Sequence, residues 1–167
     1  AGSEFRIAAR AEDVTLAYVP SEPDAASPWP AFNCVSGELV FERASMTIRN
    51  AQARVFGVEL SRVNGSIPDL AQPLLHIEGQ ARGPVADMLR YVNLTPVAGW
   101  LGDALREASV TGNGELGLVL DIPIDAAERT AVRGRLALAG NDLRWTPSLP
   151  LLANARARIE FSDKGLS

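Results

Sequence analysis

Enzymatic or metal chemistry in this chain would depend on one histidine and one cysteine. His76 could serve as a general base or complete a Ser-His-Asp triad, but it stands on the polar phase of an alternating segment, where a solvated surface histidine is the simpler interpretation. Metal sites need several His, Cys or carboxylate ligands close together, and Cys34 is far from His76 in sequence. We expect Cys34 to be a small buried hydrophobic residue. The sequence therefore predicts no catalytic residue, no metal and no cofactor.

Two further motifs have structural interpretations. The acidic pair Glu12 and Asp13 has no partner that the sequence can identify, so we interpret the pair as turn residues. Gly112 and Gly114 flank an asparagine, but no strand-to-helix transition follows them, which excludes a phosphate-binding loop. These glycines are typical of a turn or a bulge.

Composition limits the classes of protein to consider. The chain has 167 residues, 47% of them hydrophobic and 22% charged, which is typical of one globular domain. Its formal net charge of -4 gives no electrostatic reason to expect a nucleic-acid partner. One cysteine permits no intrachain disulfide, and no apolar run is long enough for a membrane span.

Alternation of apolar and polar residues is the main structural signal. It predicts strands with one dry and one wet face, with phase changes at bulges or turns. The segments that show it are 36–67, which we interpret as a meander of short antiparallel strands, 75–82, 114–124, 132–138 and 155–161. The sequence predicts a mainly β fold, a curved antiparallel sheet or β-groove.

Two other segments predict pairs of strands joined by turns. In residues 5–19 we expect two strands around a turn at Glu12 and Asp13. After 132–138 we expect a tight turn at residues 140–142 and a short strand at 143–145.

Residues 84–108 interrupt the strands with a predicted pair of short amphipathic helices. Val85, Met88, Leu89 and Val92 have helical spacing after Pro84, and Thr95 with Pro96 predicts a second helix start. We expect the pair to cover the apolar side of the sheet. The expected covering residues are Met88, Leu89, Val92, Trp100, Leu101 and Leu105.

The two ends of the chain resemble each other. An offset of 129 residues aligns 6–9 with 135–138, and an offset of 120 aligns Phe41 with Phe161. We interpret residues 5–167 as a single domain holding one full repeat and the start of the next, preceded by a cloning scar or native lead-in at 1–5. The chain is expected to be a fragment of a longer protein, and dimerisation through cut strand edges is one expected consequence.

A side of the sheet that is aliphatic, with Gly and Ala between, would leave an apolar trough if two short helices are its only cover. Such a trough suits acyl chains, because each methylene that leaves water contributes about 0.8 kcal/mol. The residues expected to line it are Leu39, Phe41, Ile48, Val55, Leu60, Leu75, Ile77, Leu116, Leu118, Leu120, Leu136 and Leu138.

Four segments resemble a known family. The strand SGELVF at Ser36–Phe41, the helix entry at Gly83–Pro96, the link at Ala139–Pro150 and the strand at Ala157–Gly165 are similar to the periplasmic region of YhdP-like proteins of the AsmA superfamily, which is related to the TamB-type β-groove proteins. The resemblance covers the chain from about residue 5 onward. It includes no catalytic motif.

The resemblance implies a periplasmic part of an inner-membrane protein in a Gram-negative bacterium, in which repeated β units form a groove. It implies a bridge that carries phospholipids between inner and outer membranes, with phospholipid acyl chains, neighbouring repeats and, through segments outside this chain, the membrane as partners. The alternative is a non-catalytic scaffold or partner-binding module in envelope assembly. Whether the helices line or cap the groove is open, and an enzyme is disfavoured.

Overall fold

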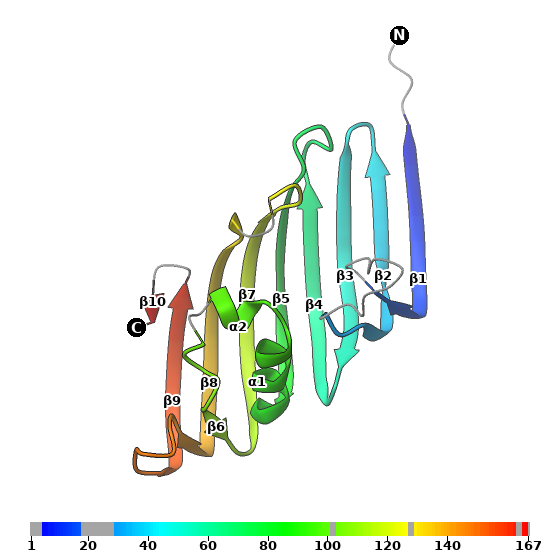
Figure 1. The fold of residues 1–167 in the computed structure, drawn as a ribbon. Coiled ribbons are helices and arrows are strands. Elements are labelled where there is room, and N and C mark those ends of the chain that lie inside the picture. Colours follow the sequence, from blue (N-terminus) through cyan, green and yellow to red (C-terminus); the bar gives the residue numbers. More distant parts are fainter. Residues whose placement is uncertain (1–4, 18–28, 101–102, 127–128, 163–164, 167) are drawn as a thin grey trace, which may run out of the picture.

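The computed structural model describes residues 5–17, 29–100, 103–126, 129–162 and 165–166. It shows one open, antiparallel ten-stranded sheet with two short helices on one side (Figure 1). The predicted mainly β fold with an inserted pair of short helices is confirmed. The elements are β1 (Arg6–Leu16), β2 (Phe32–Glu42), β3 (Ser45–Val55), β4 (Val58–Ile67), β5 (Leu74–Pro84), α1 (Val85–Leu94), α2 (Val97–Trp100), β6 (Ser109–Val110), β7 (Asn113–Pro123), β8 (Ala131–Arg144), β9 (Leu152–Ser162) and β10 (Gly165–Leu166).

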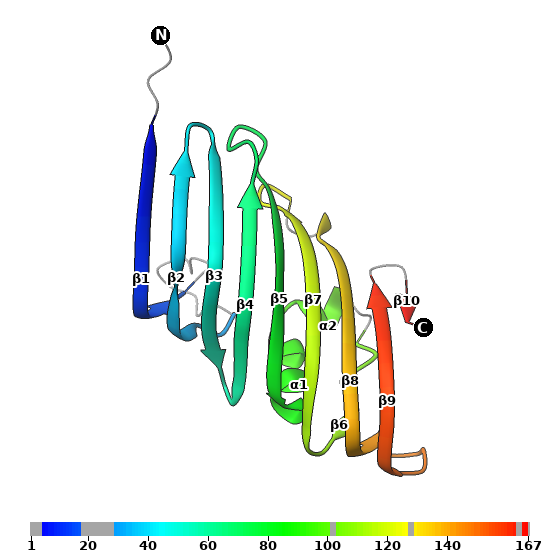
Figure 2. The same cartoon turned by 180° about the vertical axis from the view of Figure 1, so that it is seen from behind.

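Strands that follow one another in sequence are neighbours in the sheet. The order is β1-β2-β3-β4-β5-β7-β8-β9-β10, and the two-residue β6 pairs with β8 near its end. The predicted meander over 36–67 corresponds to β2, β3 and β4, which are joined by short turns. Seen from behind, the same strands form an uninterrupted sheet with the helices beyond it (Figure 2).

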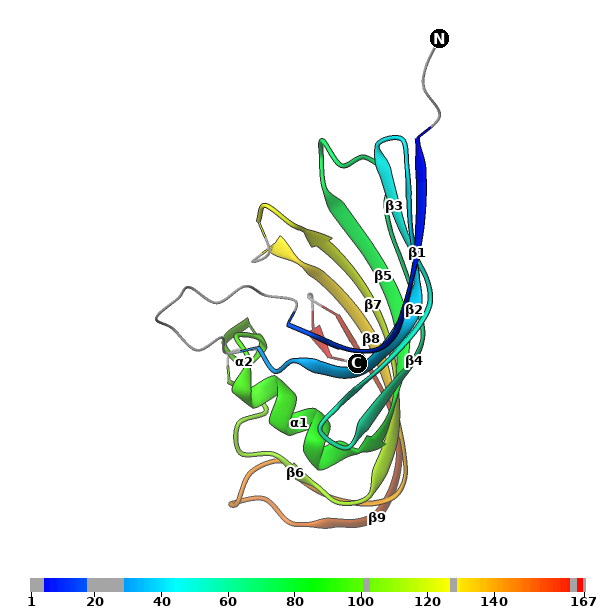
Figure 3. The same cartoon turned by 90° about the vertical axis from the view of Figure 1, so that its right-hand side faces the viewer.

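Bulges bend the long strands. Among the described residues, six strands each contain a residue with positive φ at or beside an irregular point of the strand pairing. A bulge kinks its strand and increases the local twist. The sheet accordingly curves toward the side that carries the helices (Figure 3). The residues are Asp13, Cys34, Asn50, Arg62, Gly140 and Asn154.

Two predicted turns are wrong for the same reason. Asp13 lies inside the continuous strand β1, and Gly140 lies inside the continuous strand β8. Asp, Asn and Gly tolerate positive φ in a bulge as readily as in a turn, so residue types do not distinguish the two. The chain therefore has one strand where two were expected at 5–19, and one where two were expected at 132–145.

Helix α1 forms as predicted, but the second helix is shorter than expected. Thr95 ends α1 instead of beginning the next helix, because its hydroxyl donates to the Val92 carbonyl at 3.2 Å. Helix α2 then spans four residues. Leu101 lies outside the described residues, and Leu105 follows α2 in a turn.

The two end hairpins, β1–β2 and β8–β9, share one pairing register. Adding 127 to a residue number in β1 gives the equivalent residue of β8, so Arg6 corresponds to Arg133. Adding 120 relates β2 to β9 in the same way, so Glu42 corresponds to Ser162. Every partner pair of the first hairpin then has its counterpart in the second. The structural offset for the first strand is thus 127, not 129. One full repeat plus the start of the next stays a prediction.

Asn141 is a buried polar residue in the second hairpin, with 1% of its surface exposed. Its amide nitrogen donates to the Thr111 carbonyl at 2.6 Å and the Asn113 carbonyl at 2.9 Å, and its amide oxygen accepts from the Ala139 N–H. The position corresponds to Val14, which is 44% exposed in the first hairpin. Asn141 therefore fastens the loop before β7 to β8.

We predict that Asn141→Val lowers the free energy of unfolding by about 1–3 kcal/mol, because three part-buried hydrogen bonds, to Thr111, Asn113 and Ala139, are lost. Urea unfolding of the whole chain measures this. Val14→Asn, at the equivalent exposed position, is the control and should change stability little. An Asn141→Val variant as stable as the unsubstituted chain would contradict the assigned role.

Candidate functional site: an apolar face covered at one end

Cross-strand pairing places the expected trough residues on one side of the sheet. Leu39 pairs with Ile48, Ile48 with Gly65, Gly65 with Ile77 and Ile77 with Leu120, so these residues form one row across five neighbouring strands. Because side chains alternate along each strand, the other predicted residues share this side. We call it the apolar face, and the opposite side the outer face. The apolar face includes Leu39, Phe41, Ile48, Val55, Leu60, Leu75, Ile77, Leu116, Leu118, Leu120, Leu136 and Leu138.

Helix α1 covers one end of the apolar face. Met88 and Tyr91 pack against the buried cluster of Val55, Val58 and Ala81. On its other flank, Val85 and Leu89 pack with Leu138 and Val110. The predicted packing of this helix on the sheet is confirmed, and Val55 and Leu138 are consequently buried under it, with 6% and 4% of their surfaces exposed.

Three further contacts hold α1 over the strands. The Gly57 N–H donates to the Asp87 carboxylate at 3.2 Å, which ties the first turn of α1 to the β3–β4 turn. The Arg90 guanidinium lies 4.2 Å from the centroid of the Phe56 ring. The Tyr91 ring stacks on Phe32 at the start of β2, with 6.4 Å between centroids. Helix α1 thus bridges the sheet from β8 to β2.

Away from α1 the apolar face is only half-buried. Leu39, Ile48, Ile77 and Leu120 are each partly exposed. In the row farther from α1, exposure ranges from 3% at Ile67 on β4 to 48% at Ile7 on the edge strand β1. The face is therefore dry under α1 and half-buried over much of the remainder.

Some glycines of the apolar face are covered by neighbouring side chains. A Cβ added at Gly134 would lie 2.1 Å from the Phe161 ring, and one at Gly65 would lie within 3.5 Å of the Ile48 and Ile77 side chains. Neighbouring side chains thus lie over these glycines. We had expected small residues to leave room above the sheet, and at Gly134 that expectation is wrong because Phe161 occupies the space.

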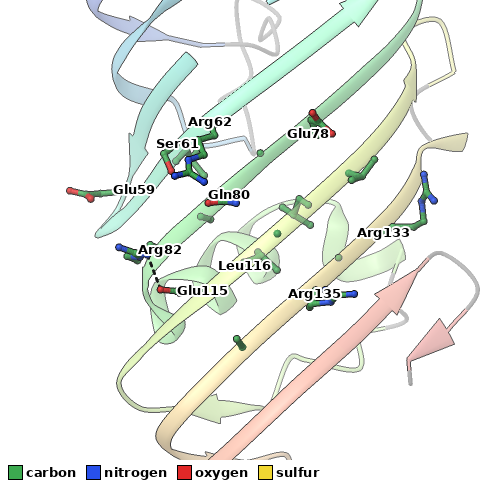
Figure 4. A pocket seen from close by; sticks show the side chains of 18 of the residues that line it. Glu59, Ser61, Arg62, Glu78, Gln80, Arg82, Glu115, Leu116, Arg133 and Arg135 are labelled. Carbon is green, nitrogen blue, oxygen red and sulfur yellow. Dashed lines mark ion pairs between the residues drawn. The ribbon is translucent and has the colours of Figure 1, made fainter. Parts of the chain in front are cut away.

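The outer face is polar. A hollow of about 1490 Å³ lies on it, lined by side chains from β2 to β9 that include ion pairs between neighbouring strands (Figure 4). Helix α1 lies behind the sheet in this view. Apolar and charged side chains therefore lie on opposite sides of one sheet.

His76 lies on the outer face as a surface residue. Its Nδ1 is 2.6 Å from the Asp121 carboxylate, and 45% of its side chain is exposed. Ser66 is its cross-strand neighbour, but the hydrogen bonds of the described residues include none between Ser66 and His76. The three residue types of a catalytic triad are adjacent without the nucleophile–base contact that a triad requires.

Cys34 is exposed, so the expectation that it is buried is wrong. It occupies the β2 bulge with φ of 50°, and the bulge interrupts the alternation that would have placed it inside. Within the described ranges, no group of three or more His, Cys, Asp or Glu side chains could hold a metal ion. No helix in this part of the chain is long and apolar enough to cross a membrane.

Comparison with known proteins identifies the family. The family model described as YhdP protein matches residues 1–167, which is the whole chain. The chain belongs to the YhdP family. A curated relative, the "Intermembrane phospholipid transporter YhdP" of Escherichia coli strain K12, is 28% identical over 138 residues, which cover 83% of this chain and 11% of that protein. The chain thus spans about a tenth of that relative's length, and no solved structure matches it significantly.

We predict that Gly134→Ala destabilises the chain by about 1–3 kcal/mol, because the new methyl group must displace the Phe161 ring. In a Phe161→Ala background the same substitution should cost much less, since the obstructing ring is gone. Urea unfolding of the two single variants and the double variant measures the coupling. Equal costs in both backgrounds would show that Phe161 does not lie over Gly134.

Proposed function

We propose that this member of the YhdP family forms part of a phospholipid conduit in which acyl chains lie on the apolar face while head groups stay in water. The observation that carries this proposal is the row of apolar side chains that continues from strand to strand without a charged residue. The row runs from Ala9 through Leu39 and Ile77 to Val132. It crosses seven strands, which corresponds to about 30 Å.

Transport along this row needs no bond chemistry. Each methylene that rests on the face instead of in water contributes about 0.8 kcal/mol. The row from Ala9 to Val132 contains no polar side chain that would hold a head group at one place. A lipid can therefore shift from strand to strand with little change in free energy. The proposed role is accordingly non-enzymatic.

Helix α1 forms a side wall in this proposal. It covers the end of the strands where Val55 and Leu138 lie and leaves the row through Ile48 and Ile77 open. The path therefore passes beside the helix, across the strands, instead of ending beneath it.

Continuity with neighbouring units would lengthen the conduit. Gly165 and Leu166 of β10 pair with β9 in the register in which Ser45 and Met46 of β3 pair with β2. Strands continuing in that register would extend the apolar face. We propose that neighbouring repeats do so, in the periplasm of a Gram-negative bacterium, within a parent protein anchored in the inner membrane.

The E. coli relative's name supports the substrate class, since it is an intermembrane phospholipid transporter. The scaffold alternative differs in what covers the apolar face, because a partner protein would then occupy it instead of lipid. Lipid carried by the purified chain therefore separates the two functions.

We predict that Leu120→Asp removes phospholipid that co-purifies with the chain, because an acyl chain lying on the row would have to take the new carboxylate out of water. Val119→Asp is the matched control, since Val119 is the adjacent residue and faces the outer side opposite Glu78. Phosphorus analysis and mass spectrometry of the extracted lipid give the lipid-to-protein ratio, and circular dichroism reports the fold.

Equal lipid in both variants, or a lipid-free unsubstituted chain, would contradict the conduit. If Leu120→Asp fails to fold, Ile77→Asn places a neutral polar group in the same row and serves as the second test.

A further inference from the structure

The outer-face hollow contains a concentration of arginine at one end. Over β3 to β7 three arginines and three glutamates line it, and they include the pair Arg54 with Glu59 and the pair Arg82 with Glu115, the latter at 2.8 Å. Such cross-strand pairs leave that part of the surface nearly neutral.

The hairpin β8–β9 differs. Arg133, Arg135, Arg156 and Arg158 accompany one carboxylate, Glu160, which pairs with Arg135 at 2.8 Å, while Asp142 and Arg144 lie beyond the Gly140 bulge. Within the described ranges no ion pair involves Arg133, Arg156 or Arg158, and all three are exposed. The hairpin therefore carries a local positive charge in a chain whose net charge is -4.

These arginines form a line. Arg133 and Arg135 lie two residues apart on β8, and Arg158 and Arg156 continue the same direction on β9, opposite Ala137 and Ala139. Residues two apart on a strand are about 7 Å apart, so the line is roughly 20 Å long. Figure 4 shows Arg133 and Arg135 on β8, at the side of the hollow nearest β9.

The equivalent hairpin shows that the fold does not need this charge. With the same register, β1–β2 places Arg6 opposite Glu42 and Arg10 opposite Glu38. In β8–β9 the two carboxylate positions hold Ser162 and Arg158. Of Arg133, Arg135, Arg156 and Arg158, only Arg135 has a carboxylate opposite it, so the second hairpin leaves unbalanced the positive charge that the first hairpin balances.

We propose that the arginine line binds an acidic, extended segment of a partner protein. Arginine binds carboxylates in a bidentate geometry, and alternate side chains of an extended strand recur about every 7 Å, which matches the spacing of the line. Arg133, Arg135 and Arg158 line the hollow, and an extended segment can enter this concave surface where a flat bilayer cannot. This site lies on the outer face, so the proposal does not depend on whether lipid binds the apolar face.

The test is fluorescence anisotropy with the whole chain and a labelled ten-residue peptide in which Glu alternates with Thr. In the double variant Arg156→Ser, Arg158→Glu, each arginine is replaced by the residue at the equivalent position of the first hairpin, Ser36 or Glu38. The same hairpin fold therefore already accommodates these residue types. We expect about tenfold weaker binding, and weaker binding of the unsubstituted chain at higher salt.

Arg6→Ser with Arg10→Glu is the control, because it changes the net charge by the same amount on the first hairpin and should leave binding intact. Equal loss in both double variants would mean a response to net charge and would overturn the proposal. Equal binding of the peptide with Gln in place of Glu would overturn it as well, and so would tighter binding of vesicles of anionic phospholipid, which would assign the line to a membrane surface.

Discussion

The constraint on which this structure depends is that a one-residue change of register moves every side chain of a strand to the other face. Each bulge inserts such a change, and six of the long strands contain one. The apolar face remains continuous because bulges on neighbouring strands lie beside each other and compensate. On one side of the Asp13 bulge Ala11 pairs with Gly37, and on the other side Val14 pairs with Val35, so apolar or small residues are paired on both sides. The sheet can therefore bend without mixing its two faces.

This separation gives the two faces different physical roles. On one side, aliphatic side chains are half-buried and only α1 covers them, so removing hydrocarbon from water is the available driving force. On the other side, arginines and carboxylates remain in water, where individual pairs contribute little to stability and charge patterns govern recognition. A sheet one layer thick thereby separates an apolar surface from a polar one.

Much of the apolar face could be predicted from sequence, because alternation at Leu39, Ile77 and Leu120 is a local signal. Four features could not. Asp13 and Gly140 suit a turn and a bulge equally, so strand continuity depends on pairing across the sheet. Thr95 is typical of a helix start but ends α1, where its N–H and its hydroxyl both donate to the Val92 carbonyl. The covering of Gly134 by Phe161, and the line formed by Arg133 and Arg158, arise only from the register of β8 with β9.

The most direct measurement of the central claim is photocrosslinking of the whole chain with a phospholipid that carries a photoreactive group on one acyl chain, followed by mapping of the adducts by mass spectrometry. The account predicts adducts at apolar-face residues such as Leu39, Ile48 and Ile77, and few at their outer-face neighbours. Adducts spread equally over both faces, or confined to the outer face, would contradict it.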